Sequence, residues 1–319
     1  MSNSKTIGSA PHPARSLLGL SLLSLAMAAP FVRAQPAPVQ EDLTVSGSVA
    51  VGAEHNDNLS VSQLESASGR SDSALTTDAS VNLLWKPADK LTAETGYSYT
   101  MSRYQELESY DLDMHLLFAD LSYEFKPFTL GGNYYFADAD LGRESFLSLN
   151  QYSLYAGKLL GEAWYLRGAL NFSEKDFDLF TSRDADNDGF SVDVYHFFNE
   201  GRSSVSVSYA YEDENTRDAA FAYTANTLRL RLNHSVMLGT REAKLQVGYR
   251  LQDRNYDTIT PGINAARDDT QNVVDAKLEV PIVEQLALLA RWEHGDYSSK
   301  LPSADYTDNR ISLALEYTF

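Results

Sequence analysis

The sequence has no cysteine among its 319 residues. Disulfides, a thiol nucleophile and lipidation at a mature N-terminal cysteine are therefore excluded. Past the N-terminal region, no stretch approaches the about 20 apolar residues that a membrane-spanning helix needs. Basic residues are scarce as well, because 26 Lys and Arg oppose 44 Asp and Glu, for a formal net charge of −18. A basic nucleic-acid groove is excluded as a global feature, so we expect no nucleic-acid partner.

The first 34 residues have the pattern of a secretory signal peptide. Lys5 and Arg15 form a basic region, and the apolar stretch 17–29 follows it. Small side chains at Val32 and Ala34 predict cleavage after Ala34. A membrane anchor is the alternative, but about 13 apolar residues are too few to span a bilayer. Cleavage leaves 23 basic and 44 acidic residues in an exported chain with a net charge of −21.

Period-two alternation dominates the chain from residue 43 to the end. For example, leucines at 228, 230 and 232 alternate with Arg229, Arg231 and Asn233. A strand between two different solvents requires one apolar and one polar face. Most of the alternating segments exceed the five or six residues of a typical globular strand and match or exceed the about 9–11 of a tilted membrane strand. The predicted strands are 43–54, 74–85, 90–103, 111–125, 128–140, 148–159, 163–176, 187–198, 203–213, 222–236, 242–255, 270–281, 285–297 and 307–319.

Short turns and long polar loops alternate between these strands. The short turns are expected at 86–89, 126–127, 161–162, 199–202, 239–241 and 283–284. The long loops are expected at 55–73, 104–110, 141–147, 177–186, 214–221, 256–269 and 298–306. Bacterial outer-membrane barrels have this asymmetry, with tight periplasmic turns and longer extracellular loops.

The sequence therefore predicts an all-β protein, a 14-stranded antiparallel up-and-down transmembrane β-barrel over residues 43–319. A short periplasmic segment at 35–42 precedes it, and both termini are expected in the periplasm of a Gram-negative bacterium. Tyr and Phe cluster near strand ends, as in the aromatic girdles of membrane barrels. A soluble β-sandwich is the alternative. Within 112–125 the apolar positions change from even to odd numbers, which predicts a β-bulge near Leu116–Phe118.

The last predicted strand ends on a phenylalanine. Ile311, Leu313, Leu315, Tyr317 and Phe319 share one face. This ending resembles the terminal signal by which the barrel assembly machinery recognises outer-membrane barrels. The resemblance implies that Tyr317 and Phe319 form an assembly signal. It also implies periplasmic chaperones and the assembly machinery as partners during insertion into outer-membrane lipid.

A finer resemblance covers the stretch from Arg143 to Phe198, including residues 164–168 and 183–186. This stretch is similar to the C-terminal barrel of surface lipoprotein assembly modifier proteins. Those proteins carry helical tetratricopeptide repeats before the barrel, whereas about eight residues separate the expected cleavage site from the first strand here. The resemblance implies a protein-translocating, lipoprotein-export barrel as an alternative function.

Charged residues alternate with the apolar rows and are expected to point into the lumen. Facing acidic and basic walls orient and select polar solutes in a channel, although the same charges also suit cross-strand ion pairs. We expect a porin-like channel for small polar solutes; a structural or surface-interaction barrel with a filled lumen is a further alternative. The candidate lumen residues are Arg229, Arg231, Lys244, Arg250, Arg254, Arg291, Glu94 and Glu293.

One segment predicts a metal site. Asp184, Asp186 and Asp188, followed by Gly189, match the opening of a calcium loop. Its closing glutamate is missing, because the twelfth position is Tyr195, and a solvated acidic turn is the alternative. Ca²⁺ is thus a candidate ligand, and no other cofactor is expected.

Catalytic patterns are lacking. The mature chain carries five histidines with no sequence spacing that joins one to a serine, and neither a Walker loop nor a GxSxG or HExxH motif occurs. We therefore expect no enzymatic activity. The histidines are His55, His115, His196, His234 and His294.

Overall fold

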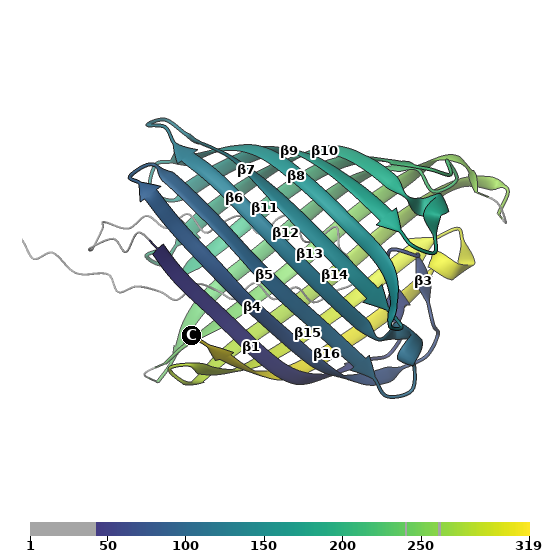
Figure 1. Cartoon of the computed structure of the whole chain (residues 1–319), viewed down its shortest axis with the longest axis horizontal. Helices are drawn as coiled ribbons and strands as arrows, with labels where there is room; N and C mark the ends of the chain where they lie inside the picture. The colour runs from purple at the N-terminus through teal and green to yellow at the C-terminus, as the bar shows by residue number, and fades with distance from the viewer. Residues whose placement is uncertain (1–42, 240, 261–262) are drawn as a thin grey trace, which may run out of the picture.

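The computed structural model describes residues 43–239, 241–260 and 263–319. The predicted signal peptide and the segment 35–42 lie outside the described residues. Fourteen of the described strands form one closed antiparallel barrel, in which each strand pairs with its neighbours in the chain and the first pairs with the last (Figure 1). The predicted fold class is confirmed.

The barrel strands are longer than predicted at many ends. They are β1 (Leu43–Asn56), β4 (Asp72–Ala88), β5 (Leu91–Tyr104), β6 (Leu112–Glu124), β7 (Thr129–Leu141), β8 (Glu144–Leu160), β9 (Trp164–Phe177), β10 (Ala185–Phe198), β11 (Ser203–Thr216), β12 (Tyr223–Leu238), β13 (Arg241–Thr260), β14 (Ala265–Val283), β15 (Leu286–Ser299) and β16 (Tyr306–Thr318). The remaining elements are the two-residue strands β2 (Ser60–Val61) and β3 (Ser66–Ala67) and the 3₁₀ turns η2 (Glu108–Tyr110), η3 (Thr181–Arg183) and η4 (Pro302–Ala304). None of the described helices is long and apolar enough to cross a membrane.

The alternation of the sequence becomes an outer and an inner face. Leu228 and Leu230 of β12 lie on the outside, 37% and 41% exposed, while Arg229 between them points inward. Toward one end of the barrel, acidic residues replace the apolar ones on the outer rows; Asp186 and Asp188 of β10 belong to this acidic rim. An apolar belt bounded by charges is what a barrel in a bilayer requires.

The two ends of the barrel differ, and we call them the turn end and the loop end. The described C-terminus lies at the turn end (Figure 1), together with the six predicted short turns. Two of the seven long loops predicted at the other end are wrong. Residues 142–143 alone join β7 to β8, with φ of +61° at Gly142 and +68° at Arg143, and two such residues form a tight hairpin turn. Four residues separate β13 from β14, because both strands extend into the region 256–269.

The predicted bulge near Leu116–Phe118 is also wrong. β6 pairs with β5 and β7 without a shift of register through these residues. Bulges or irregularities lie instead at Trp85/Ala88, Ala139/Asp140, Asn255/Ile259 and Pro281/Val283. The apolar pattern of β6 changes because both of its faces are apolar over part of its length, not because the strand changes register.

The final strand closes the barrel through its last residue. Phe319 donates its backbone N–H to the carbonyl of Gly47 and accepts the N–H of Gly47, both at 3.0 Å. The phenylalanine ring lies over Gly47, where a Cβ would stand 2.4 Å from the ring atom Cζ. Glycine is therefore required at position 47 for this ring to pack against the seam. Phe319 and Tyr317 both lie exposed on the outer face.

Candidate functional site in the lumen

All eight candidate lumen residues lie on inward rows, as the alternation predicts. Most of them are paired there. Lys244 lies 2.7 Å from Glu279, Arg231 3.8 Å from Asp275, and Arg291 3.5 Å from Asp78. Glu293 lies 4.0 Å from Arg310, and Arg254 3.4 Å from Glu65. The ion pairs that the sequence left as an alternative are thus present over much of the wall.

Arg229 and Arg250 differ from the other inward charges. They are directly opposite each other on β12 and β13, and neither side chain forms a hydrogen bond or ion pair with another described residue. On the far side of the ring, Glu94 of β5 is similarly without such a contact among the described residues. Like charges in direct register repel each other. This arrangement therefore does not stabilise the wall, and it leaves charge available to a solute or ion.

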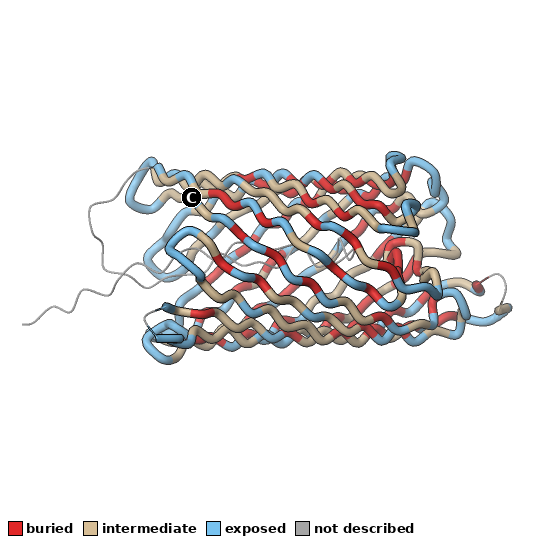
Figure 2. Tube along the Cα trace, turned by 90° about the horizontal axis from the view of Figure 1, so that it is seen from below, coloured by how far each residue is buried: buried red, intermediate tan, exposed pale blue. Residues whose placement is uncertain are grey.

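The lumen is divided into an accessible half and a filled half. Toward the turn end, inward residues such as Asn82, Asn133 and Gln246 are only half-buried, and the inward side chain of Arg231 is 47% exposed. Toward the loop end, inward residues such as Gln252 are buried. Figure 2 shows how buried and exposed residues alternate along the strands. The charged middle of the barrel is thus less buried than its packed loop half.

Part of the filling is an apolar cluster on the inner wall that the sequence analysis did not predict. Four even-numbered residues of β6 point inward and join it, and two of them, Leu116 and Phe118, belong to the segment predicted as a bulge. Val61, from the connection between β1 and β4, packs into the same cluster, and Leu64 packs against it. The buried members are Val61, Leu112, Met114, Leu116, Phe118, Tyr135, Ala137, Ala139, Phe146, Leu147, Leu149 and Phe177.

The connection between β1 and β4, residues 57–71, folds into the lumen at the loop end, and we call it the inward loop. It contains β2 and β3, and Figure 1 shows β3 at this end of the barrel. Its base is tied by hydrogen bonds from the N–H of Leu59 to the carbonyl of Arg70 at 3.1 Å and from the N–H of Ser68 to the carbonyl of Leu59 at 2.7 Å. Ser60 donates to Asp308 of β16 at 2.9 Å. The inward loop is thus a small, hydrogen-bonded hairpin attached to the barrel wall.

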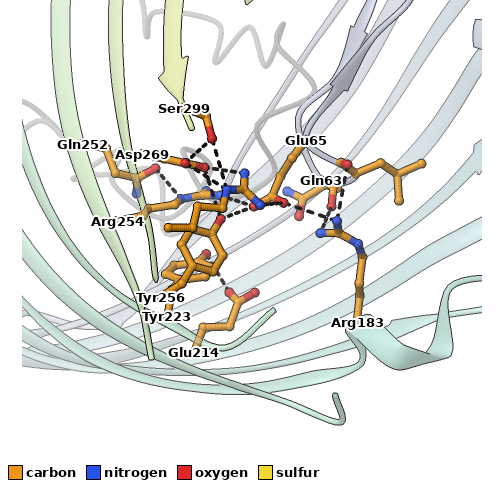
Figure 3. A network of polar contacts seen from close by, with 12 residues as sticks. Gln63, Glu65, Arg183, Glu214, Tyr223, Gln252, Arg254, Tyr256, Asp269 and Ser299 are labelled. Atoms are coloured by element: carbon orange, nitrogen blue, oxygen red, sulfur yellow. Dashed lines mark hydrogen bonds and ion pairs between the residues drawn. The ribbon is translucent and has the colours of Figure 1, made fainter. Parts of the chain in front are cut away.

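Glu65, at the tip of the inward loop, is held by three arginines (Figure 3). Its Oε2 lies 2.8 Å from Arg267 Nη1 and 3.3 Å from Arg183 Nη2, and its Oε1 lies 3.4 Å from Arg254 Nη1. The hydroxyl of Tyr256 donates to Oε1 as well. Glu65 is buried, and four donors from the β9–β10 connection, β13 and β14 therefore surround one carboxylate.

The electrostatics of Glu65 follow from these contacts. Burial by itself raises the pKa of a carboxyl group. Arg183, Arg267 and Arg254 outweigh this effect, and they lower the pKa of Glu65 from its ordinary value of 4.5 to about 2. Glu65 is therefore an anion throughout the physiological range. Its backbone has a φ of +52°, a left-handed conformation that costs a non-glycine residue about 1–2 kcal/mol. The contacts of the side chain offset this strain.

The predicted calcium loop is not formed. Asp186 and Asp188 lie in β10 on the outer face, not in a loop. Asp184 accepts the N–H of Phe177 at 2.8 Å and lies 2.9 Å from Arg217. Across the described residues, no group of three or more His, Asp and Glu side chains is placed to hold a metal ion. Calcium binding by this segment stays a prediction.

Two histidines do contact serines, which no sequence spacing indicated. His234 Nδ1 lies 2.8 Å from Ser203 Oγ, and His55 Nδ1 lies 2.9 Å from Ser73 Oγ. A hydrolase triad needs a third residue that bonds to the histidine, and neither histidine has such a contact among the described residues. Asn199 bonds to Ser203 and not to His234. Ser203 is also buried. The expectation of no enzymatic activity stays a prediction.

The sequence matches no protein-family model and no curated protein. The structure, however, is similar to solved outer-membrane barrels. An anion-selective porin from Comamonas acidovorans is 10% identical, with a TM-score of 0.51 over 87% of this chain and 99% of that chain. In-vitro folded OmpT of Vibrio cholerae, in its trimer form, is 11% identical, with a TM-score of 0.52 over 88% of this chain and 100% of that chain. OmpT of Vibrio cholerae expressed in the outer membrane is 12% identical, with the same TM-score over 88% and 99% of the two chains.

These similarities define the class of the protein by its fold. The chain has the fold of an outer-membrane β-barrel, and porins are among the proteins that share it. At such low identities the likeness extends to the fold alone. The finer resemblance to surface lipoprotein assembly modifiers receives no support and stays a prediction.

Proposed function

We propose that the protein is a porin-like outer-membrane channel for small polar solutes, and that the inward loop narrows its opening at the cell surface. In this orientation the turn end and both termini are periplasmic. The observation that carries the proposal is the accessible, charged middle of the lumen. There the adjacent Arg229 and Arg250 have no ion-pair partner among the described residues, and a 14-stranded barrel leaves internal space unless loops fill it.

The packed loop half favours a second candidate, the barrel with a filled lumen. Both candidates contain the same inward loop, but they differ in what happens when it is removed. A channel narrowed by the loop conducts more without it, whereas a barrel filled by its wall side chains does not. An export barrel for surface lipoproteins has no specific observation in its favour.

The base of the inward loop offers a clean way to remove it. Leu59 and Ser68 already form a backbone hydrogen bond of 2.7 Å, so residues 60–67 can be excised and the two ends joined as a short turn. We expect the shortened, correctly folded barrel to give larger and longer-lived conductance steps in planar bilayers than the full chain. No conductance from the folded, shortened barrel would refute the channel and leave the filled barrel.

The control changes exposed residues of another loop at the same end of the barrel. Residues 217–222 connect β11 to β12, and Asp218 and Ala219 there are exposed. Substituting both by glycine should leave the conductance steps unchanged. A similar increase from this variant would show that the barrel responds to any loop change, and the inward loop would have no special role.

A further inference from the structure

The arginines around Glu65 are held in place independently of it. Arg183 lies over the ring of Phe221 at 4.1 Å, and Arg254 lies over Tyr223 at 4.6 Å. Arg267 similarly lies over a tyrosine ring at 4.4 Å. Cation–π contacts of this kind orient a guanidinium group without neutralising it. The donors of Arg254 and Arg267 therefore stay directed at the same point when the carboxylate is absent, because both belong to barrel strands.

Two arginines of the same cluster lose their ion-pair partner once Glu65 is removed. Arg267 keeps Asp269, with Nε to Oδ1 at 2.9 Å, and Lys175 keeps Glu214. Arg183 and Arg254, in contrast, have no carboxylate other than Glu65 within ion-pair distance among the described residues. A buried guanidinium without a counter-charge is strongly unfavourable. Arg183 and Arg254 thus favour an anion at the position of the Glu65 carboxylate, whether or not that anion belongs to this chain.

The present occupant is attached in a way that permits exchange. Glu65 sits in a left-handed conformation at the tip of a hairpin whose covalent connections to the barrel are both at its base. Its tip is held by non-covalent contacts alone, namely those of Glu65 and the hydrogen bonds from Arg183 to the carbonyls of Gln63 and Leu64. A small polar cavity beside its carboxylate, lined by residues including Gln63, Arg183 and Arg254, has room for about one water molecule. When the hairpin moves away, solvent can therefore reach the position that the carboxylate of Glu65 occupies in this structure.

We propose that Arg183, Arg254, Arg267 and Tyr256 form a binding site for a small carboxylate solute, with Glu65 as a tethered occupant. A free carboxylate competes with Glu65 and releases the inward loop from the lumen. A planar carboxylate fits because each oxygen of Glu65 has its own pair of donors. The link to solute passage rests on the proposed channel, whereas the binding site does not.

Chemical rescue tests the site directly. Glu65→Ala removes Cγ and the carboxylate, and acetate supplies the same atoms. We expect the substitution to lower the unfolding temperature of the refolded full chain in micelles. Sodium acetate should restore at least half of that loss, while sodium chloride at equal ionic strength and neutral acetamide should restore none. Glu106→Ala is the matched control, because Glu106 pairs only with Arg70, in an exposed ion pair.

The remaining arms separate the outcomes. Adding Arg254→Gln to Glu65→Ala should abolish the rescue by acetate. Rescue that persists in the double variant would mean that acetate binds outside this arginine cluster. Equal rescue by sulfate would overturn the assignment to carboxylates. If Glu65→Ala does not fold, the same competition can be tested on the unmodified chain. There, acetate should accelerate amide exchange in the inward loop, and no acceleration would refute competition with Glu65. Acetate binding without conductance by the shortened barrel would refute only the channel, and conductance without acetate binding would refute only this site.

Discussion

Neutralising Glu65 should open the inward loop while leaving the barrel folded. Glu65→Gln keeps the shape of the side chain but leaves Arg183 and Arg254 without a counter-charge. Breaking a buried ion pair costs about 3–5 kcal/mol, and we take about 3 because the amide oxygen still accepts hydrogen bonds. The alternative is for the loop to leave the lumen. That exposes Leu59 and Val61, which are 1% and 3% exposed, at about 1.5–3 kcal/mol each.

These magnitudes set the size of the effect. Because about 1.4 kcal/mol changes an equilibrium tenfold, a loss of about 3 kcal/mol makes the open loop roughly 100-fold more populated. Hydrogen exchange with mass spectrometry reads this population through four amides that are bonded within the loop or to its base. The N–H groups of Leu59, Leu64, Glu65 and Ser68 donate to the carbonyls of Arg70, Val61, Ser62 and Leu59.

We expect these four amides to exchange roughly 100-fold faster in Glu65→Gln, in line with the same conversion, with the amides of the barrel strands unchanged. Glu106→Gln is the control, since its exposed ion pair with Arg70 is worth less than about 1 kcal/mol. Equal exchange of the four amides in the unmodified chain and in Glu65→Gln would refute the reasoning, because it would mean that the arginines do not hold the loop.

Three further predictions concern pH, the seam and the lumen. The lowered pKa of Glu65 contributes stability that is complete above the ordinary value of 4.5 and is lost as the pH falls toward 2. Amide exchange in the inward loop, corrected for its intrinsic rate, should therefore accelerate only below about pH 4.5. Opening of the loop near pH 6 would contradict this. Gly47→Ala should lower the unfolding temperature, because its Cβ would lie 2.4 Å from the ring of Phe319; an unchanged value in refolded protein would contradict the close packing. Arg250→Gln in the shortened barrel should shift the reversal potential in a KCl gradient toward cations without lowering stability, since it removes the repulsion with Arg229; an unchanged potential would place the pair outside the ion path.

Most of the barrel could be predicted because its determinants are local. The alternation of β12 and the short turns at the turn end are read from neighbouring residues, and they give the correct strand number and the correct inward rows. The turn at Gly142 and Arg143 was missed because an arginine with positive φ has no clear sequence pattern. The calcium loop was predicted from spacing alone, without knowing that β10 begins at Ala185.

The site around Glu65 could not be predicted, because it depends on long-range pairing. Glu65 is 189 residues from Arg254 and 202 residues from Arg267, and no periodicity connects them. One local signal was available. Leu59, Val61 and Leu64 are apolar residues in a loop that is otherwise polar, and such residues need a partner surface.

That signal has a counterpart on the barrel wall, and together they explain why the loop lies where it does. The inward row of β6, from Leu112 to Phe118, is apolar although it faces the lumen, and with no loop present part of it would be an uncovered apolar surface. The opposite wall, on β13 and β14, carries arginines that need a counter-charge. Val61 of the inward loop packs against the apolar wall, and Glu65 of the same loop pairs with the arginines of the opposite wall. The two walls are therefore complementary to two faces of one hairpin. Neither surface would have a partner without this hairpin, and both are therefore best explained as the surface that binds the inward loop.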